Sequence, residues 1–208
     1  AYLSQRGYYP DEMEKANQDA HVEVENFMAD EGAEDLHLFG VFDGHGKTGD
    51  HCAGYVRDQL PGLLKTKFKY HPQDFEKAYK EAFIQVNEGL HKSSIDDSLS
   101  GTTAIVVLFE GGTIHVANVG DSRAIIAQQR DDHLVAYSLS RDSRFVAPHA
   151  MHRSDDAISA PRRQWQNHRL CSFTSATVTL AISLRWTRAN WTASKICFAG
   201  GWVCGEVK

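Results

Sequence analysis

The sequence predicts an α+β fold in which antiparallel strands pack against α-helices. Three observations support this class. Short apolar or alternating segments come first, two longer segments with helical periodicity follow, and β-branched segments separated by glycine turns come last. Strands joined by short turns pair in antiparallel fashion, and helices inserted between strands pack on a sheet face. We therefore expect sheet and helices in layers.

Two strands are expected ahead of the helices. Residues 21–27 alternate between polar and apolar side chains, which is the period-two pattern of a half-buried strand. Residues 36–42 are almost continuously apolar and end at Asp43-Gly44, which is typical of a strand buried on both faces. We therefore expect one half-buried strand at residues 21–27 and one fully buried strand at residues 36–42.

Two helices are expected between residues 49 and 90. The second follows Pro72 and Asp74, and its apolar side chains recur every three or four positions: Phe75, Tyr79, Ala82, Phe83, Val86 and Leu90. The first covers about residues 49–68. We expect Pro61-Gly62 to break or kink it, because proline lacks an N–H and clashes with the preceding turn.

Consecutive antiparallel strands are expected after the helices. Residues 102–109 are β-branched and apolar, Gly111-Gly112 suits a hairpin turn, and residues 113–119 form the returning strand. Gly120-Asp121 then turns the chain into a further strand at residues 122–128.

The overall composition excludes several classes of protein. The chain has 208 residues and a formal charge of −5, so it has no general basic field for nucleic acid or an anionic membrane. No apolar run approaches the roughly 18 residues of a spanning helix, and the first residues do not form a secretory leader. We expect no nucleic-acid or membrane partner, a cytoplasmic or nuclear location, and a monomer. The four cysteines are too few and too scattered for a disulfide scaffold or a zinc site.

The composition changes sharply near residue 142. Residues 1–142 carry a net charge of −11, whereas residues 143–208 carry +6 and contain all four tryptophans. We interpret the first part as the beginning of a catalytic domain. Residues 143–208 are predicted to be an unrelated basic tail, either frame-shifted or poorly ordered, with a genuine basic accessory segment as the alternative.

Asp43-Gly44-His45-Gly46 carries the most chemical information in the chain. A carboxylate at the end of a buried strand is held rigidly, and flanking glycines let backbone carbonyls approach a bound ion. His45 is close enough in sequence to donate a proton to a leaving group near that ion. By itself the string is also compatible with an ordinary turn.

Two further carboxylates strengthen the metal interpretation. Asp19 lies just before the first strand, and Asp121 lies between two later strands, where each residue alone would suit a turn. Together with Asp43 they form an oxygen-rich set, which Mg²⁺ or Mn²⁺ prefers and Zn²⁺ does not.

Several short motifs follow one another in residues 1–142. They are Gly7-Tyr8-Tyr9-Pro10 with Asn17-Gln18-Asp19-Ala20, Phe39-Gly40-Val41-Phe42-Asp43-Gly44-His45-Gly46, Ser100-Gly101-Thr102-Thr103-Ala104, and Val116-Ala117-Asn118-Val119-Gly120-Asp121-Ser122-Arg123-Ala124. In order and spacing these motifs resemble the metal-dependent protein serine/threonine phosphatase family, type 2C. The resemblance covers the amino-terminal part of that catalytic domain.

The resemblance implies a fold and a set of roles. The fold would be a β-sandwich of two antiparallel sheets flanked by helices, here partial because the carboxyl-terminal half is missing. Asp43 would bridge two Mg²⁺ or Mn²⁺ ions, the Gly44 carbonyl would bind one of them, Asp19 would hold metal-bound water, and Asp121 would join a weaker third position. His45 would be the general acid toward the leaving Ser or Thr oxygen of a phosphoprotein substrate. Arg6 is our candidate for the phosphate clamp, because a guanidinium group suits phosphoryl oxygens.

The sequence departs from the family pattern after Asp142. The family's second half supplies two more metal-binding aspartates, but the only acidic residues after position 143 are Asp155, Asp156 and Glu206, and none lies in a matching context. We interpret residues 143–208 as a shifted frame, a retained intron or a gene-model error, and sequencing the transcript across the junction tests this. An uninterrupted frame in an abundant transcript would count against it.

Two functions therefore stay open, beside a third hypothesis of a non-functional truncated product that folds poorly. The first is a metal-dependent protein serine/threonine phosphatase, truncated and impaired by the loss of metal ligands. The alternative is a catalytically silent phosphatase-like module that binds or regulates other proteins.

Overall fold

The computed structural model describes residues 3–32, 35–130 and 133–142, together with three short strands at 184–185, 194–199 and 203–207. Its larger sheet has the strand order β1, β2, β4, β5, β8, with β3 also paired to β2. The bounds are β1 (Asp19–Val24), β2 (Leu36–His45), β3 (Gly101–Thr102), β4 (Ala104–Glu110), β5 (Thr113–Val119) and β8 (Leu184–Arg185). All of its described pairings are antiparallel, as expected.

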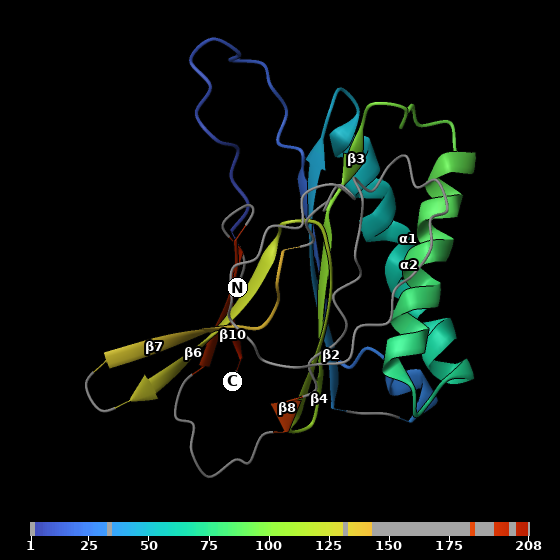
Figure 1. The fold of residues 1–208 in the computed structure, drawn as a ribbon, viewed down its shortest axis with the longest axis vertical. Coiled ribbons are helices and arrows are strands. Elements are labelled where there is room, and N and C mark those ends of the chain that lie inside the picture. The colour runs from blue at the N-terminus through green and yellow to red at the C-terminus, as the bar shows by residue number, and fades with distance from the viewer. Residues whose placement is uncertain are drawn as a thin grey trace, which may run out of the picture.

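Two long helices cover one face of this sheet (Figure 1). They are α1 (Gly49–Tyr70) and α2 (Phe75–Lys92), and a short 3-10 helix, η1 (Ala29–Glu31), lies between β1 and β2. Asp74 caps α2, since its side chain accepts a hydrogen bond of 3.0 Å from the N–H of Lys77. The helix predicted from the periodicity of residues 75–90 is confirmed.

Of the expected break or kink at Pro61-Gly62, the break is wrong, because α1 continues through both residues, and the kink stays a prediction. The reason lies in packing on either side of the proline. Val56, Leu60 and Leu64 are at most 1% exposed, so the same helix face is buried before and after Pro61. That burial outweighs the loss of one backbone hydrogen bond.

The second sheet has the order β10, β9, β6, β7 and lies on the other side of the larger sheet from the helices (Figure 1). Its strands are β6 (Arg123–Arg130), β7 (His133–Ser138), β9 (Ser194–Ala199) and β10 (Val203–Val207). The turn at Gly120-Asp121 therefore does not return the chain along β5, and β6 pairs with β7 and β9 instead. Apart from β8, β9 and β10, the expected tail of residues 143–208 lies outside the described residues.

Two apolar clusters hold these layers together. Side chains from β2, β4 and β5 that face the helices pack with α1 and α2, and Leu38, Phe42 and Leu108 in this cluster are fully buried. Side chains on the opposite face, with Val41 and Ile105 among them, pack with Ile126 of β6 in the second sheet. The expected α+β sandwich with flanking helices is thus confirmed. Within the described residues, no helix is long and apolar enough to span a membrane.

Candidate active site

The antiparallel register brings Asp19 and Asp43 together. Asp19 is the first residue of β1, Asp43 lies near the end of β2, and the two residues are direct partners across the strand pair. Directly opposed residues point their side chains to the same face of a sheet. Two carboxyl groups that are distant in sequence therefore lie side by side, which the sequence alone did not establish.

The electrostatics of this pair are unfavourable without a compensating cation or proton. Burial raises the pKa of Asp43 from its ordinary 3.8 to about 6, and the charges of Asp19 and Asp121 add to the rise. Burial also raises the pKa of Asp19, although a hydrogen bond between the two carboxyl groups partly lowers it. Like charges in a half-buried place favour the neutral form unless positive charge is supplied.

Asp121 joins the site from the turn between β5 and β6. It is exposed, and its charge acts on Asp43. Among the described residues, however, no three His, Cys, Asp or Glu side chains lie close enough together to hold a metal ion by themselves. The structure thus brings Asp19 and Asp43 into contact and places Asp121 within electrostatic reach of them.

The backbone around Gly44 is packed too tightly for any side chain. A Cβ atom at this position would lie 2.2 Å from the Gly49 carbonyl oxygen and 2.6 Å from that of Gln18. The Gly44 N–H donates to the same Gln18 oxygen over 3.2 Å, and Gln18 Nε2 donates to the Gly46 carbonyl over 2.7 Å. Only glycine fits where β1, β2 and the start of α1 converge.

Thr103 connects Asp43 to the Asp121 turn, and sequence reasoning assigned it no role. Its Oγ1 accepts a hydrogen bond of 3.0 Å from the Asp43 N–H, and its N–H donates to the Asp43 carbonyl over 2.9 Å. The same Oγ1 lies 2.6 Å from Oγ of Ser122, the residue after Asp121. Thr103 and Ser122 occur in the motifs quoted above, but their contact could be found only from the fold.

His45 and Arg6 lie in different settings. His45 is exposed at the end of β2 and is the register partner of Gly101 in β3, so it lies two residues from Asp43 at the same end of the sheet. Arg6 lies in the exposed segment before β1, where its Nη1 donates to the carbonyl of Met13 and, over 3.0 Å, to that of Lys15. These contacts brace the segment itself, and the role of Arg6 in binding phosphate stays a prediction.

Residues 10–157 match the family model described as protein phosphatase 2C. The chain belongs to the protein phosphatase 2C family. The match continues past the change in composition near residue 142, and the origin of the tail stays a prediction.

Known members of the protein phosphatase 2C family support this assignment. "Probable protein phosphatase 2C 35" of Arabidopsis thaliana is 49% identical over 140 residues, which is 67% of this chain and 39% of that protein. "Protein phosphatase 2C 1" of Paramecium tetraurelia is 34% identical over 129 residues, 56% of this chain and 40% of that protein. This chain thus spans about two fifths of the length of these relatives.

Solved structures support the fold alone. A bacterial serine phosphatase superimposes with a TM-score of 0.59 at 17% identity, covering 95% of this chain and 74% of that one. PppA of Pseudomonas aeruginosa superimposes with a TM-score of 0.54 at 20% identity and the same coverage.

The residues present fit the divalent metal on which protein phosphatase 2C enzymes depend. Asp19 and Asp43 offer adjacent carboxylate oxygens whose mutual repulsion a cation would relieve. The close packing at Gly44 leaves its backbone free of any side chain beside this pair. The donors are all hard oxygens, so the set suits Mg²⁺ or Mn²⁺.

Proposed function

We propose that this chain carries the amino-terminal half of a metal-dependent protein serine/threonine phosphatase site. Its substrate would be phosphoserine or phosphothreonine in a phosphoprotein. The half-buried Asp19–Asp43 pair carries the proposal, because two hydrogen-bonded carboxyl groups with raised pKa values form a site that binds positive charge.

Each ligand role follows from position. Asp43 would hold the metal ions and Asp19 would hold water bound to them, the Gly44 carbonyl would contribute from the same strand end, and Asp121 would join from its turn. When bound, Mg²⁺ or Mn²⁺ supplies the positive charge that lets water ionise near neutral pH. Two ions are expected from the family pattern.

The remaining residues act on the phosphate ester directly. His45 is exposed at the same strand end and would hold the proton that the departing Ser or Thr oxygen takes up. Arg6 would orient the phosphoryl oxygens through the guanidinium donors that its loop contacts do not use. Because water would be the nucleophile, no covalent intermediate with the protein is required.

Metal affinity is proposed to be weak. A Mg²⁺ ion requires near-octahedral oxygen coordination, and among the described residues only Asp19 and Asp43 are brought into contact, with Asp121 within electrostatic reach. We therefore expect impaired activity in this chain and better retention of Mn²⁺ than of Mg²⁺.

Hydrolysis of an aryl phosphate in Mn²⁺ tests the proposal. We expect slow turnover that chelation abolishes and that Asp43→Asn lowers at least about 100-fold, because the variant loses a metal ligand. Asp58→Asn is the matched control, since Asp58 is an exposed carboxylate of α1 whose partner is Arg57. Turnover that persists unchanged in Asp43→Asn would refute the metal assignment.

A catalytically silent binding module is the second candidate. It is favoured by the lack of any three-residue metal cluster among the described side chains. In this case the purified chain would show native circular dichroism and a cooperative thermal melt, yet would neither bind Mn²⁺ nor hydrolyse the aryl phosphate. Mn²⁺-dependent turnover would exclude this candidate.

A further inference from the structure

The segment that follows His45 is held by the loop between α2 and β3. This loop, residues 93–100, is called the 93–100 loop below. The N–H of Thr48 donates to Ser100 Oγ over 3.1 Å, and Thr48 Oγ1 donates to the Asp96 carbonyl over 2.5 Å. Gly46 has a φ of +83°, and a Cβ there would lie 2.4 Å from the Leu99 carbonyl oxygen. The backbone on the carboxyl side of His45 is thus packed against the 93–100 loop.

The 93–100 loop is itself joined to α2 by a close polar contact between Asp97 and His91, in addition to the hydrogen bonds from Ser93 to the Leu90 carbonyl. Asp97 Oδ2 lies 2.6 Å from Nδ1 of His91 in the last turn of α2, and the Asp97 side chain is only 16% exposed. Within the described part of the chain, this buried oxygen accepts no well-aligned hydrogen bond. The Nδ1 of His91, 2.6 Å away, is therefore the polar atom that faces this buried oxygen.

Asp97 also lies near the beginning of α1. Burial raises the pKa of the Cys52 thiol, and the charge of Asp97 contributes to the rise. Cys52 belongs to the first turn of α1, and its N–H donates to the Thr48 carbonyl over 3.0 Å. The Asp97 carboxylate thus lies beside the end of α2 and within electrostatic reach of the beginning of α1.

We propose that His91 and Asp97 are positioning residues for His45, acting through the 93–100 loop and Thr48. The inference rests on the proposed function, because His45 has an acid role only there. A proton donor must lie within hydrogen-bond distance of the departing oxygen, and a displacement of about 1 Å can cost on the order of 100-fold in rate. Release of Asp97 would let the 93–100 loop move and would loosen the backbone beside His45.

Asp97→Ala is the main variant, and it is tested in two ways on the full chain. Hydrogen exchange at the Thr48 amide, which donates to Ser100, is expected to accelerate about tenfold. With Mn²⁺ present, kcat for a phosphothreonine peptide is expected to fall about tenfold at unchanged KM, while hydrolysis of an aryl phosphate changes less than about twofold. An aryl leaving group is a weak base and needs little help from an acid, so only the alkyl ester depends on the placement of His45.

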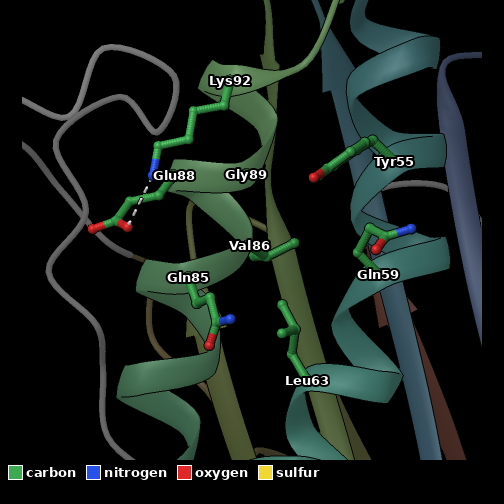
Figure 2. A pocket seen from close by; sticks show the side chains of 8 residues that line it. All are labelled: Tyr55, Gln59, Leu63, Gln85, Val86, Glu88, Gly89 and Lys92. Atoms are coloured by element: carbon green, nitrogen blue, oxygen red, sulfur yellow. Dashed lines mark ion pairs between the residues drawn. The ribbon is translucent and has the colours of Figure 1, made fainter.

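Two companion variants separate positioning from general destabilisation. His91→Lys places a cationic donor beside Asp97 and is expected to restore most of the peptide activity that His91→Leu loses. Glu88→Gln is the matched control on the same helix: Glu88 pairs with Lys92 over 3.7 Å and lines the outer groove between α1 and α2 (Figure 2). It is expected to leave both readouts unchanged.

Each alternative outcome has a distinct meaning. Unchanged exchange at Thr48 in Asp97→Ala would overturn the inference, and so would an equal loss of activity on both substrates. A wild-type chain that hydrolyses neither substrate in Mn²⁺ would overturn the proposed function and with it the catalytic meaning of the pair. The exchange data would then still decide whether Asp97 holds Thr48.

Discussion

Two strand pairs of the larger sheet differ in what they bury. In β4 and β5, at the centre, every residue from Ala104 to Phe109 and from Ile114 to Val119 is buried. In β1, at the edge, only Ala20 is buried, and the end of the β1–β2 pair holds the two carboxyl groups Asp19 and Asp43. One pair stabilises the sandwich, and the other places like charges side by side.

The difference shows where this fold can accept an unfavourable arrangement. A charged pair in the centre would lose its water whichever face it pointed to, because both faces are covered there, at a cost of several kcal/mol per ion. At the edge, Asp19 and Asp43 keep part of their hydration, so their repulsion remains small enough to be offset by a cation. The apolar centre thus supplies the rigidity on which the polar end depends.

Removing apolar volume from the centre is expected to have the largest effect on stability. Leu108 is fully buried between the sheet and the helices, so Leu108→Ala should lower the free energy of unfolding by about 3 kcal/mol. Urea denaturation checks this. Ile84→Ala, which alters a side chain of α2 that is 44% exposed, is the control and should change stability far less. Equal losses in the two variants would mean that the central strands are not the stabilising layer.

Thr103, which connects the centre of the sheet to Asp43, is expected to have the next largest effect on stability. Thr103→Val removes the hydroxyl that accepts from the Asp43 N–H and contacts Ser122, so it should cost about 1.5 kcal/mol. It should also weaken Mn²⁺ binding about tenfold, because Asp43 loses a group that orients it. Thr113→Val at the start of β5 is the control, and calorimetric titration with Mn²⁺ gives the comparison. Unchanged affinity in Thr103→Val would show that Asp43 is held by other contacts.

Local pattern was sufficient for most of the fold. The alternation in β1, the apolar run of β2 and the three-to-four spacing in α2 each follow from neighbouring residues. The lost backbone hydrogen bond at Pro61 can be read from the local sequence, and it led to the expectation of a helix break. The burial of Leu60 and Leu64, which keeps the helix intact, depends on how α1 packs on the sheet and cannot be read locally. The change of sheet at Gly120 was not predicted for a similar reason, since a turn residue does not specify which strand the next segment will join.

The candidate site was predictable in composition and not in geometry. The positions of Asp19, Asp43 and Asp121 beside turns indicated a metal site, but their grouping depends on the β1–β2 register and on the β4–β5 pairing, which ends just before Asp121. The contact between Thr103 and Ser122 joins residues 19 positions apart, and a sequence pattern carries no signal for it. The roles of His45 and Arg6 stay predictions.

The charged end of the sheet, where Asp19 and Asp43 lie side by side, should make the stability of the metal-free protein sensitive to pH. The pKa of Asp43 is about 6 in the folded chain and near 3.8 when unfolded, so between these values the folded state holds a proton that the unfolded chain has released. Stability is therefore greatest at the acidic end of this window and falls as pH rises through 6, by about 1 kcal/mol after allowance for solvent screening. Thermal melts of chelator-treated protein between pH 4 and 7 measure the change.

Two comparisons isolate the contribution of Asp43 from that of other titrating groups. Asp43→Asn should lose this part of the pH dependence, and Mn²⁺ should suppress it in the wild type by supplying the missing positive charge. Identical pH profiles for the wild type and Asp43→Asn would show that the pair is not electrostatically strained.

The outer surface of the helices should give the smallest effect. Glu88 and Lys92 form an ion pair one helical turn apart, in a groove of about 310 Å³ that Tyr55 and Leu63 line from the neighbouring helix (Figure 2). Both side chains are well exposed, at 59% and 77%, so water screens their attraction. Glu88→Gln should therefore change the free energy of unfolding by less than about 0.5 kcal/mol, with a slightly larger loss at low salt than at high salt. A loss as large as that of Thr103→Val in urea denaturation would mean that the helix layer, and not only the centre of the sheet, sets the stability on which the charged end depends.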